Sequence, residues 1–165
     1  ERRESPEDLV VREAGPADAG EIARIVHARD GGDLETTRAR IAGDLTVPER
    51  TRLFVARVAG SIVGFGRVKH LAGEHPGWYL LGVIVDPSWR RRGIGRELVR
   101  RRLDWIASRA AEAWYFVNSV NRASIDLHAG FGFEEVARGV TFPGVSFGQG
   151  GHGVLFRVPL EVSQP

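Results

Sequence analysis

Three arginines and two glycines stand close together near the middle of the chain. Arg90, Arg91 and Arg92 lead directly into Gly93, and Gly95 follows two residues later. Glycine has no side chain, so the backbone amides beside it can approach a ligand closely. The first turn of a helix adds unpaired N–H groups and the positive end of the helix dipole. The pattern therefore predicts a binding site for a phosphate or a pyrophosphate.

Two common phosphate-binding motifs do not fit these glycines. A P-loop requires glycine followed by lysine and then serine or threonine, and the chain's single lysine, Lys69, lies elsewhere. The dinucleotide-binding fingerprint requires a third glycine where this chain has Leu98. A nucleic-acid patch is a further alternative, but Trp89 is the only aromatic residue beside the arginines, and a close pyrophosphate explains the glycines better. We therefore expect no nucleic-acid partner.

A strand and a helix must hold this turn in place. Residues 78–85 form a continuous apolar run of aromatic and β-branched type, which is typical of a strand buried on both faces. Pro87 ends the run, and residues 93–111 are expected to form the longest helix of the chain. A short buried strand over residues 113–117 and a short helix over residues 121–129 follow.

The other predicted elements frame this central unit. Ile22, Ile25 and Val26 recur at helical spacing early in the chain. Ala59-Gly60-Ser61 separates two β-rich runs and is typical of a hairpin. The order of elements indicates an α+β fold in a single domain over residues 1–165. The expected elements are strands over residues 9–13, 52–58, 62–69, 133–141 and 154–160, helices after residue 16 and over residues 34–45, a loop over residues 70–77, and a glycine-rich loop between the last two strands.

The composition is that of a soluble globular domain. Hydrophobic residues make up 42% and charged residues 27% of the 165 residues, and the net charge is +2. The longest apolar run is shorter than the roughly 20 residues that a membrane-spanning helix needs. Cysteine is absent, which excludes disulfides, thiolate metal sites and a cysteine nucleophile. The five histidines show no ligand spacing, so no metal is expected, and a cytoplasmic protein without a membrane partner is expected.

Two segments resemble a known enzyme family. Val85-Asp86-Pro87, followed by Arg90-Arg91-Arg92-Gly93-Ile94-Gly95, resembles motif A of the GNAT superfamily of N-acetyltransferases, which reads Val-x-Pro and then Arg/Gln-x-x-Gly-x-Gly/Ala. Residues 121–133 resemble motif B, in which an asparagine opens a short helix that ends in Gly-Phe. The resemblance covers roughly residues 9–160. It implies the α+β GNAT fold, a mixed central sheet of about seven strands that is splayed between the fourth and fifth and flanked by about four helices.

The resemblance also implies a reaction and a site. Acetyl-CoA would be the co-substrate, and its acetyl group would pass directly to an amine of a small molecule, a protein or a peptide. The Val83 amide would face the thioester carbonyl as an oxyanion donor, amides of residues 91–96 would hold the pyrophosphate, and Asn121 would bond the pantetheine arm. The residues implied to contact acetyl-CoA are Val83, Ile84, Val85, Arg90, Arg91, Arg92, Gly93, Ile94, Gly95, Arg96 and Asn121.

The catalytic groups depart from the family pattern. Many members carry in motif B a tyrosine that protonates the departing thiolate, and this chain has His128 there, as do some small-molecule acetyltransferases of the phosphinothricin type. His128 is predicted either as the general acid or as a ring that packs on Phe131 or Phe133 and bonds the backbone. Some members place a glutamate base where this chain has Tyr79. The remaining base candidates are Glu74, His75 and a water chain to Asp86.

Several alternatives stay open at this point. Asn121 could serve only as a helix cap, and Asp30 and Asp33 could attract a cationic amine or be ordinary loop acids. The arginines at positions 100–102 are expected to be solvated or paired with Glu97 and Asp104. The whole chain could be a non-catalytic CoA-binding module instead of an enzyme. Its expected partners are acetyl-CoA and an amine acceptor, with a homodimer as a further expectation.

Overall fold

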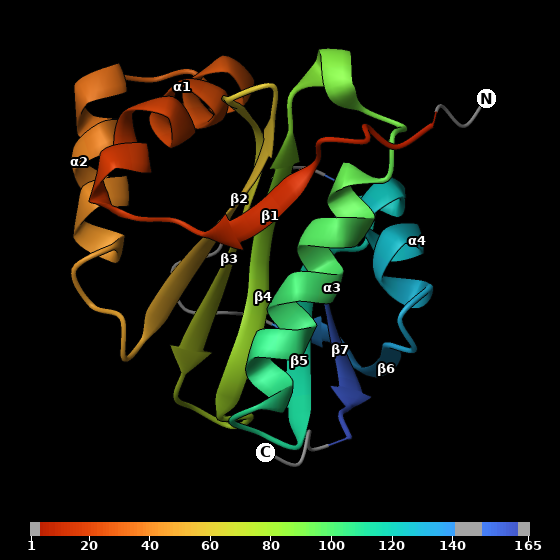
Figure 1. Ribbon diagram of the computed structural model, residues 1–165. Helices are drawn as coiled ribbons and strands as arrows, with labels where there is room; N and C mark the ends of the chain where they lie inside the picture. Colours follow the sequence, from red (N-terminus) through yellow and green to blue (C-terminus); the bar gives the residue numbers. More distant parts are fainter. Residues whose placement is uncertain (1–3, 141–149, 162–165) are drawn as a thin grey trace.

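A seven-stranded mixed sheet runs through the molecule in the order β1-β2-β3-β4-β5-β7-β6 (Figure 1). The computed structural model describes residues 4–140 and 150–161. The strands are β1 (Val10–Glu13), β2 (Thr51–Val58), β3 (Ser61–Leu71), β4 (Gly77–Val85), β5 (Glu112–Asn118), β6 (Glu134–Val140) and β7 (Gly153–Pro159). The helices are α1 (Ala19–Asp30), α2 (Leu34–Asp44), α3 (Ile94–Ala107) and α4 (Arg122–Ala129), with short 3-10 turns at Pro16–Asp18 and Pro87–Trp89.

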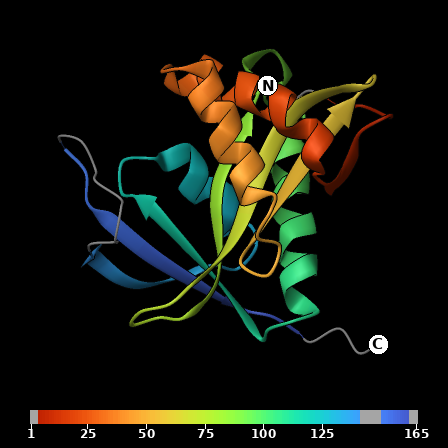
Figure 2. The ribbon, with the colours of Figure 1, turned by 90° about the vertical axis from the view of Figure 1, so that its left-hand side faces the viewer.

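The sheet is split between its fourth and fifth strands. β4 and β5 are parallel and pair only at Tyr79 with Trp114 and at Leu80 with Tyr115. Beyond Leu80 the two strands diverge toward their carboxyl ends, and the two halves of the sheet form a V (Figure 2). All other neighbouring strands are antiparallel. The expected seven strands with a splay between the fourth and the fifth are therefore confirmed.

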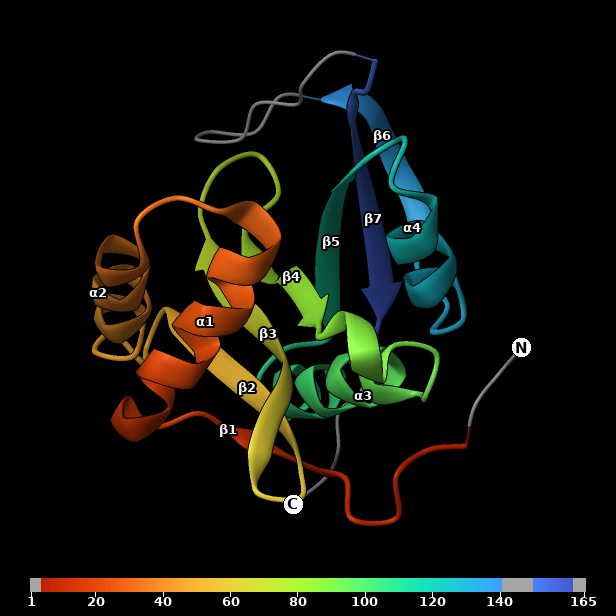
Figure 3. The ribbon, with the colours of Figure 1, turned by 90° about the horizontal axis from the view of Figure 1, so that it is seen from above.

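Helices cover both faces of the sheet. Side chains of successive strand residues point to opposite faces, so Phe54 joins the core under α3 and Val55 joins the core under α1 and α2. The helix α3 places Ile94, Leu98 and Ile106 on the sheet at spacings of four and eight residues. Figure 3 shows α1 and α2 on one side of the molecule and α3 with α4 on the other.

Some element boundaries differ from the predicted ones. The helix α3 ends at Ala107 instead of residue 111, because the amides of Arg109 and Ala110 both turn onto the Ile106 carbonyl. β3 extends to Leu71, which pairs with Gly77 and shortens the predicted loop. Residue 141 of the predicted sixth strand and most of the glycine-rich loop lie outside the described residues. No helix within residues 4–140 and 150–161 is long and apolar enough to span a bilayer.

Candidate active site

The edge of β4 carries a bulge where the sheet begins to open. Gly66 of β3 pairs with Val83, whereas Arg67 pairs with Leu81, so Gly82 is an extra residue on β4. Gly82 has φ +58° and is exposed, and a Cβ atom there would meet no atom within 4 Å. The strand thus presents bare backbone at the mouth of the splay. The sequence analysis missed this bulge, although a single glycine inside an apolar strand is its usual signal.

The turn after β4 leads directly into α3. Asp86 accepts a hydrogen bond from the Ser88 amide at 2.8 Å and so caps the 3-10 turn. Gly93 precedes α3 with φ +78°, a left-handed conformation that glycine adopts at little cost. The first helical bond runs from the Glu97 amide to the Gly93 carbonyl at 3.0 Å. The helix itself therefore supplies no acceptor for the amides of residues 94–96, which is the expected anion-binding geometry.

The arginines of the turn lie at its surface. Arg90 and Arg91 are exposed, and the Arg90 Nε donates to the Val85 carbonyl at 3.3 Å. The guanidinium of Arg92 lies 5.0 Å from the ring centre of Trp89, and that of Arg96 lies 5.7 Å from the ring centre of Phe131. These rings hold two of the cations beside the start of α3 through cation–π contacts.

The apolar side chains of the motif turn toward the protein interior to different extents. The side chain of Ile84 is buried under α1 and that of Ile94 is buried under α3. Val83 and Val85 point toward Gly95, whose Cβ would lie 3.9 and 4.0 Å from their methyl groups. Val83 and Val85 are only half-buried, so their side chains as well as their main-chain groups are accessible to a ligand.

Asn121 caps the helix α4. Its side-chain oxygen accepts a hydrogen bond from the Ser124 amide at 3.3 Å. The capping alternative is confirmed. The cap uses the oxygen alone, so the side-chain N–H₂ of the exposed Asn121 remains a donor for a ligand.

His128 is a buried ring in an aromatic stack. It is 2% exposed, and its ring lies 3.7 Å from that of Tyr115 at an interplanar angle of 8°. It also meets Phe133 edge to face at 5.6 Å. The Nδ1 donates to the Ser124 carbonyl at 2.8 Å, so in the neutral ring Nε2 carries no proton. The packing on Phe133 and the backbone bond that the sequence analysis gave as one alternative are both present. The role of His128 as general acid stays a prediction.

The electrostatics of His128 favour the neutral ring. Burial, together with a smaller effect of the nearby positive charge of Arg102, lowers the pKa of His128 to about 3, although the hydrogen bond to the Ser124 carbonyl opposes this shift. No described residue partners the buried Nε2 atom. A proton donor near neutral pH would need that atom protonated, which this environment opposes.

We expect this lowered pKa to make stability depend on pH. The unfolded chain protonates His128 below about pH 6.5, whereas the folded protein keeps the ring neutral down to about pH 3. Between these values the unfolded state binds one more proton, so the free energy of unfolding falls by up to about 1.4 kcal/mol per pH unit as pH drops. Urea titrations of wild type and His128→Phe between about pH 6.5 and 5 test this. The variant should show the weaker pH dependence, and equal slopes would contradict the prediction.

The other candidate catalytic groups lie away from the bulge or are already paired. Glu74 and His75 belong to the turn before β4, at the opposite end of the strand from Val83. The Tyr79 hydroxyl donates to the His75 carbonyl at 2.6 Å, and burial raises the pKa of Tyr79 to about 12. Asp86 uses a carboxylate oxygen on Ser88. None of these side chains is positioned as a base beside Val83.

The acids of the α1–α2 loop have structural roles. Asp33 caps α2 by accepting from the Thr36 amide at 2.7 Å. The hydrogen bond from the Thr36 hydroxyl, and then that from the amide, lower the pKa of Asp33. Asp30 pairs with Arg29 at 2.6 Å. The interpretation of both as ordinary loop acids is therefore favoured. The described residues contain no group of three or more histidine, cysteine or acidic side chains that could hold a metal ion.

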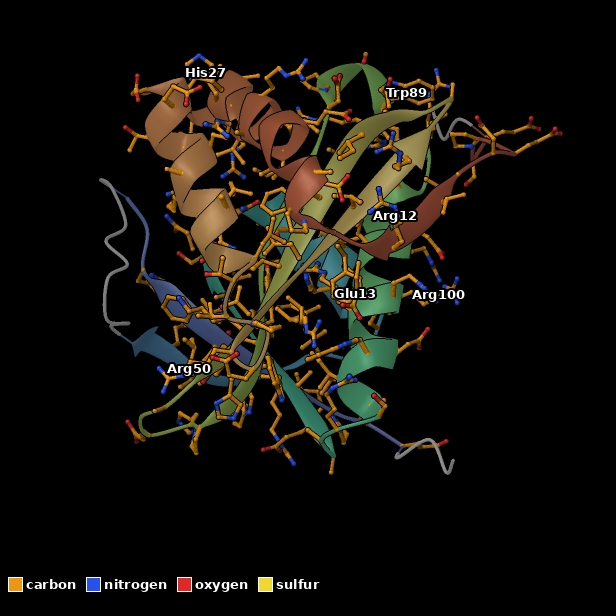
Figure 4. All side chains as sticks on the ribbon, turned by 60° about the vertical axis from the view of Figure 1, so that its left-hand side comes forward. Arg12, Glu13, His27, Arg50, Trp89 and Arg100 are labelled. Atoms are coloured by element: carbon orange, nitrogen blue, oxygen red, sulfur yellow. The ribbon has the colours of Figure 1, made fainter. Side chains whose placement is uncertain are left out.

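The three consecutive arginines of α3, at positions 100–102, do not share one environment. Arg100 extends outward from the helix, and Trp89 lies at the turn that precedes it (Figure 4). Arg100 pairs with Glu97 and lies 3.8 Å from Asp104, as predicted. Arg102 is completely buried, so its prediction as a solvated or paired residue is wrong. It stands four residues after Leu98 and four before Ile106, on the apolar stripe of the helix, and this spacing was the available signal.

Comparison with known proteins now gives the family. A model of the acetyltransferase (GNAT) family matches residues 22–133. The chain belongs to the GNAT acetyltransferase family. Among solved structures, yncA of Salmonella typhimurium, determined with its cofactor acetyl-CoA, matches with a TM-score of 0.74 and 21% identity over 96% of this chain and 98% of that one. The ribosomal-protein-S18-alanine N-acetyltransferase of Escherichia coli matches with a TM-score of 0.73 and 21% identity over 94% and 96%. The GNAT fold is therefore confirmed.

Two sequence relatives come from mycobacteria. Protein ML0378 of Mycobacterium leprae is 31% identical over 132 residues, which are 79% of this chain and 36% of that protein. The N-alpha-acetyltransferase RimI of Mycobacterium tuberculosis is 35% identical over 82 residues, which are 49% of this GNAT chain and 51% of RimI. The match thus spans only about a third to a half of the length of these relatives.

Proposed function

We propose that this GNAT protein is an acetyl-CoA-dependent N-acetyltransferase that passes an acetyl group directly to a primary amine. One observation carries the proposal: after Leu80, β4 is no longer paired with β5, although it stays paired with β3, and the chain then runs into the turn that begins α3. An extended arm with amide groups can pair with such a free strand edge, as an added strand would. A pyrophosphate at its far end would meet the N-terminus of the helix.

The residues present fit this ligand. Gly82 has open space where a side chain would stand, and Gly93 turns the chain so that the first amides of α3 face outward. When bound, acetyl-CoA supplies the acetyl group as a reactive thioester. The backbone of Val83 and Val85 would pair with the pantetheine arm, and Asn121 would donate to it. The amides of residues 91–96 would hold the pyrophosphate, with the charges of Arg90, Arg91 and Arg92 around it.

The proposed reaction needs few side chains. The lone pair of the amine forms a bond to the thioester carbon, and the Val83 amide stabilises the negative charge that grows on the oxygen. The carbon–sulfur bond then breaks, the thiolate leaves with the electron pair, and the nitrogen releases a proton to water. A thiol with a pKa near 8.5 is a fair leaving group, so water can protonate it. His128 as the proton donor is the competing version of this step.

The acceptor we propose first is the α-amine of a peptide. Two matching proteins carry names of this kind: RimI of Mycobacterium tuberculosis is an N-alpha-acetyltransferase, and the Escherichia coli relative, 37% identical over 57 residues, is named for alanine of ribosomal protein bS18. Both matches cover about half of this chain or less, so a small-molecule amine is tested beside the peptide.

A non-catalytic CoA-binding module is the second candidate. The neutral, buried ring of His128 favours it, as does the position of Glu74 and His75 at the far end of β4. Such a module would keep the phosphate-binding turn and the free strand edge but would lack turnover.

Thiol release from acetyl-CoA separates the two candidates. Purified protein is incubated with acetyl-CoA and a panel of alanine-ended peptides and small primary amines, and CoA affinity is measured by calorimetry. We expect CoA binding together with amine-dependent thiol release and an acetylated product seen by mass spectrometry. Binding without turnover across the panel would favour the module, and no affinity for CoA would reject both candidates.

Replacement of Asn121 should divide its two roles. Asn121→Ala removes both the cap and the ligand donor, so the free energy of unfolding should fall by about 1 kcal/mol, and KM for acetyl-CoA should rise. Asn121→Asp keeps a capping oxygen but loses the N–H₂ donor, so it should keep the stability and show the raised KM. Urea unfolding and steady-state kinetics measure the two effects. Unchanged kinetics in both variants would leave Asn121 with the cap alone.

A further inference from the structure

The buried guanidinium of Arg102 has no acidic partner among the described residues. Its side chain is completely buried between α3 and the sheet. The Nε donates to the Leu98 carbonyl at 3.1 Å and Nη1 donates to the Arg67 carbonyl at 2.9 Å. The Nη2 atom has no partner in residues 4–140 and 150–161, and the ion pairs within those residues do not include Arg102. Burial lowers the pKa of Arg102 to about 9.

A buried, unpaired guanidinium lowers the stability of a protein core. A buried charge loses its hydration, and replacement of buried charges by apolar residues of similar size is often neutral or stabilising. Leu98 and Ile106, one turn away on either side, show that the same stripe of α3 otherwise takes apolar residues. Stability alone therefore gives no reason for an arginine at this position.

The sheet is shaped to receive this side chain. A Cβ atom at Gly66 would lie 2.9 Å from both Cζ and Nε of Arg102. The guanidinium thus lies directly against the backbone of β3, in space that any other residue at position 66 would fill. The buried position of the Arg102 guanidinium therefore requires glycine at position 66.

This contact lies at the bulge of β4. Gly66 and Arg67 are the two residues of β3 between which the register with β4 shifts, and they face Val83 and Leu81. A bulge disrupts the ladder of backbone hydrogen bonds and leaves the extra residue, here Gly82, without a place in it. The hydrogen bond from the Arg102 Nη1 to the Arg67 carbonyl therefore ties α3 to β3 directly beside the bulge.

The same cation also lies below the point where the sheet opens. Arg102 is close enough to act on the charges of two rings there. It opposes the rise that burial causes in the pKa of Tyr115, and it adds to the lowering that burial causes in the pKa of His128. Tyr115 belongs to the last pair of residues that joins β4 to β5. The positive charge therefore lies under the base of the splay, on the α3 side, near the backbone that would meet the thioester.

We infer that Arg102 is a positioning residue for acetyl transfer, which holds the bulge of β4 through the Arg67 carbonyl so that the Val83 amide keeps its direction into the splay. The inference rests on the proposed function. It assigns no contact between Arg102 and acetyl-CoA. A small misplacement of a group that contacts the reacting atoms can cost about 100-fold in rate. Loss of the hydrogen bond from Arg102 to the Arg67 carbonyl should therefore lower kcat without weakening CoA binding.

Two variants remove the contact from opposite sides. Arg102→Met replaces the cation by an unbranched apolar side chain, and Gly66→Ala keeps the cation but fills its place. Arg101→Met is the matched control, since Arg101 is the exposed neighbour on the same helix. For both test variants we expect a kcat about 10- to 100-fold below wild type, with KM for acetyl-CoA and Kd for CoA within about twofold. The control should match wild type in all three.

A second readout does not depend on turnover. ¹⁵N relaxation dispersion should show microsecond-to-millisecond exchange at Gly82 and Val83 in the test variants, and flat profiles in wild type and Arg101→Met. If the wild type shows no turnover, the proposed function fails. The relaxation dispersion at Gly82 and Val83 still tests whether Arg102 holds the bulge of β4. Wild-type kcat or flat dispersion at the bulge in either folded variant would overturn the inference, and so would a loss of CoA affinity that matches the loss of kcat. If Arg102→Met does not fold, Gly66→Ala decides.

Discussion

The replacement Gly93→Asp is expected to weaken CoA binding by more than about tenfold, which is about 1.4 kcal/mol, while the sheet stays intact. Gly93 has φ +78° at the start of α3, beside the amides proposed to hold the pyrophosphate. A carboxylate there would repel the phosphates and fill space close to the backbone. A Cβ at this position would also lie 2.8 Å from the Ser5 Oγ, so the N-terminal segment must shift slightly. Calorimetric titration with CoA measures the effect.

Gly60→Asp is the matched control for the backbone. Gly60 has φ +79°, almost the same as Gly93, and a Cβ there would meet nothing within 4 Å. It lies in the turn between β2 and β3, where Ala59 and Gly60 both have positive φ. Both variants carry the same left-handed strain and the same new charge. Equal CoA affinity in the two folded variants would remove the turn before α3 from the proposed site.

The replacement Gly82→Val should abolish most of the acetyl transfer and leave CoA binding largely intact. A β-branched residue resists φ +58°, so the bulge should shift and turn the Val83 amide away from the thioester. The new side chain would also stand at the free edge of β4. We expect kcat/KM to fall by about 100-fold because the Val83 amide is displaced. CoA affinity should change little, because the start of α3, which would hold the phosphates, is untouched. Steady-state kinetics and calorimetry with CoA give the two quantities.

Gly60→Val is the control for the backbone strain that Gly82→Val introduces. It places the same β-branched residue at φ +79° in an open turn, so both variants should lose a similar free energy of unfolding. Turnover should be lost only in Gly82→Val. Wild-type turnover in a folded Gly82→Val protein would show that the bulge of β4 takes no part in catalysis.

The parts of the site that the sequence predicted well are those set by local backbone chemistry. The apolar run of β4, the proline after it and the glycine before α3 each act within a few residues, and the structure confirms the strand, the turn and the helix they predicted. The asparagine cap of α4 belongs to the same class, since Asn121 and Ser124 are three residues apart.

The parts that could not be predicted depend on contacts between distant segments. The register shift of β4 depends on Gly66 of the neighbouring strand. The burial of Arg102 depends on the space above that glycine. The pKa of His128 depends first on its burial, in the stack with Tyr115, and to a smaller extent on the charge of Arg102. Local signals existed, namely the single Gly82 inside β4 and the position of Arg102 on the apolar stripe of α3. They gave no measure of these environments, and the arginine run was predicted as a solvated face.

A crystal structure of the protein with CoA tests the central claim most directly. The account predicts that the pantetheine arm pairs with the backbone of Val83 and Val85 between β4 and β5, and that the pyrophosphate lies on the amides of residues 91–96. The sulfur should then lie near the bulge at Gly82. CoA bound elsewhere, or a splay that closes so that β4 and β5 pair beyond Leu80 with CoA present, would contradict the account.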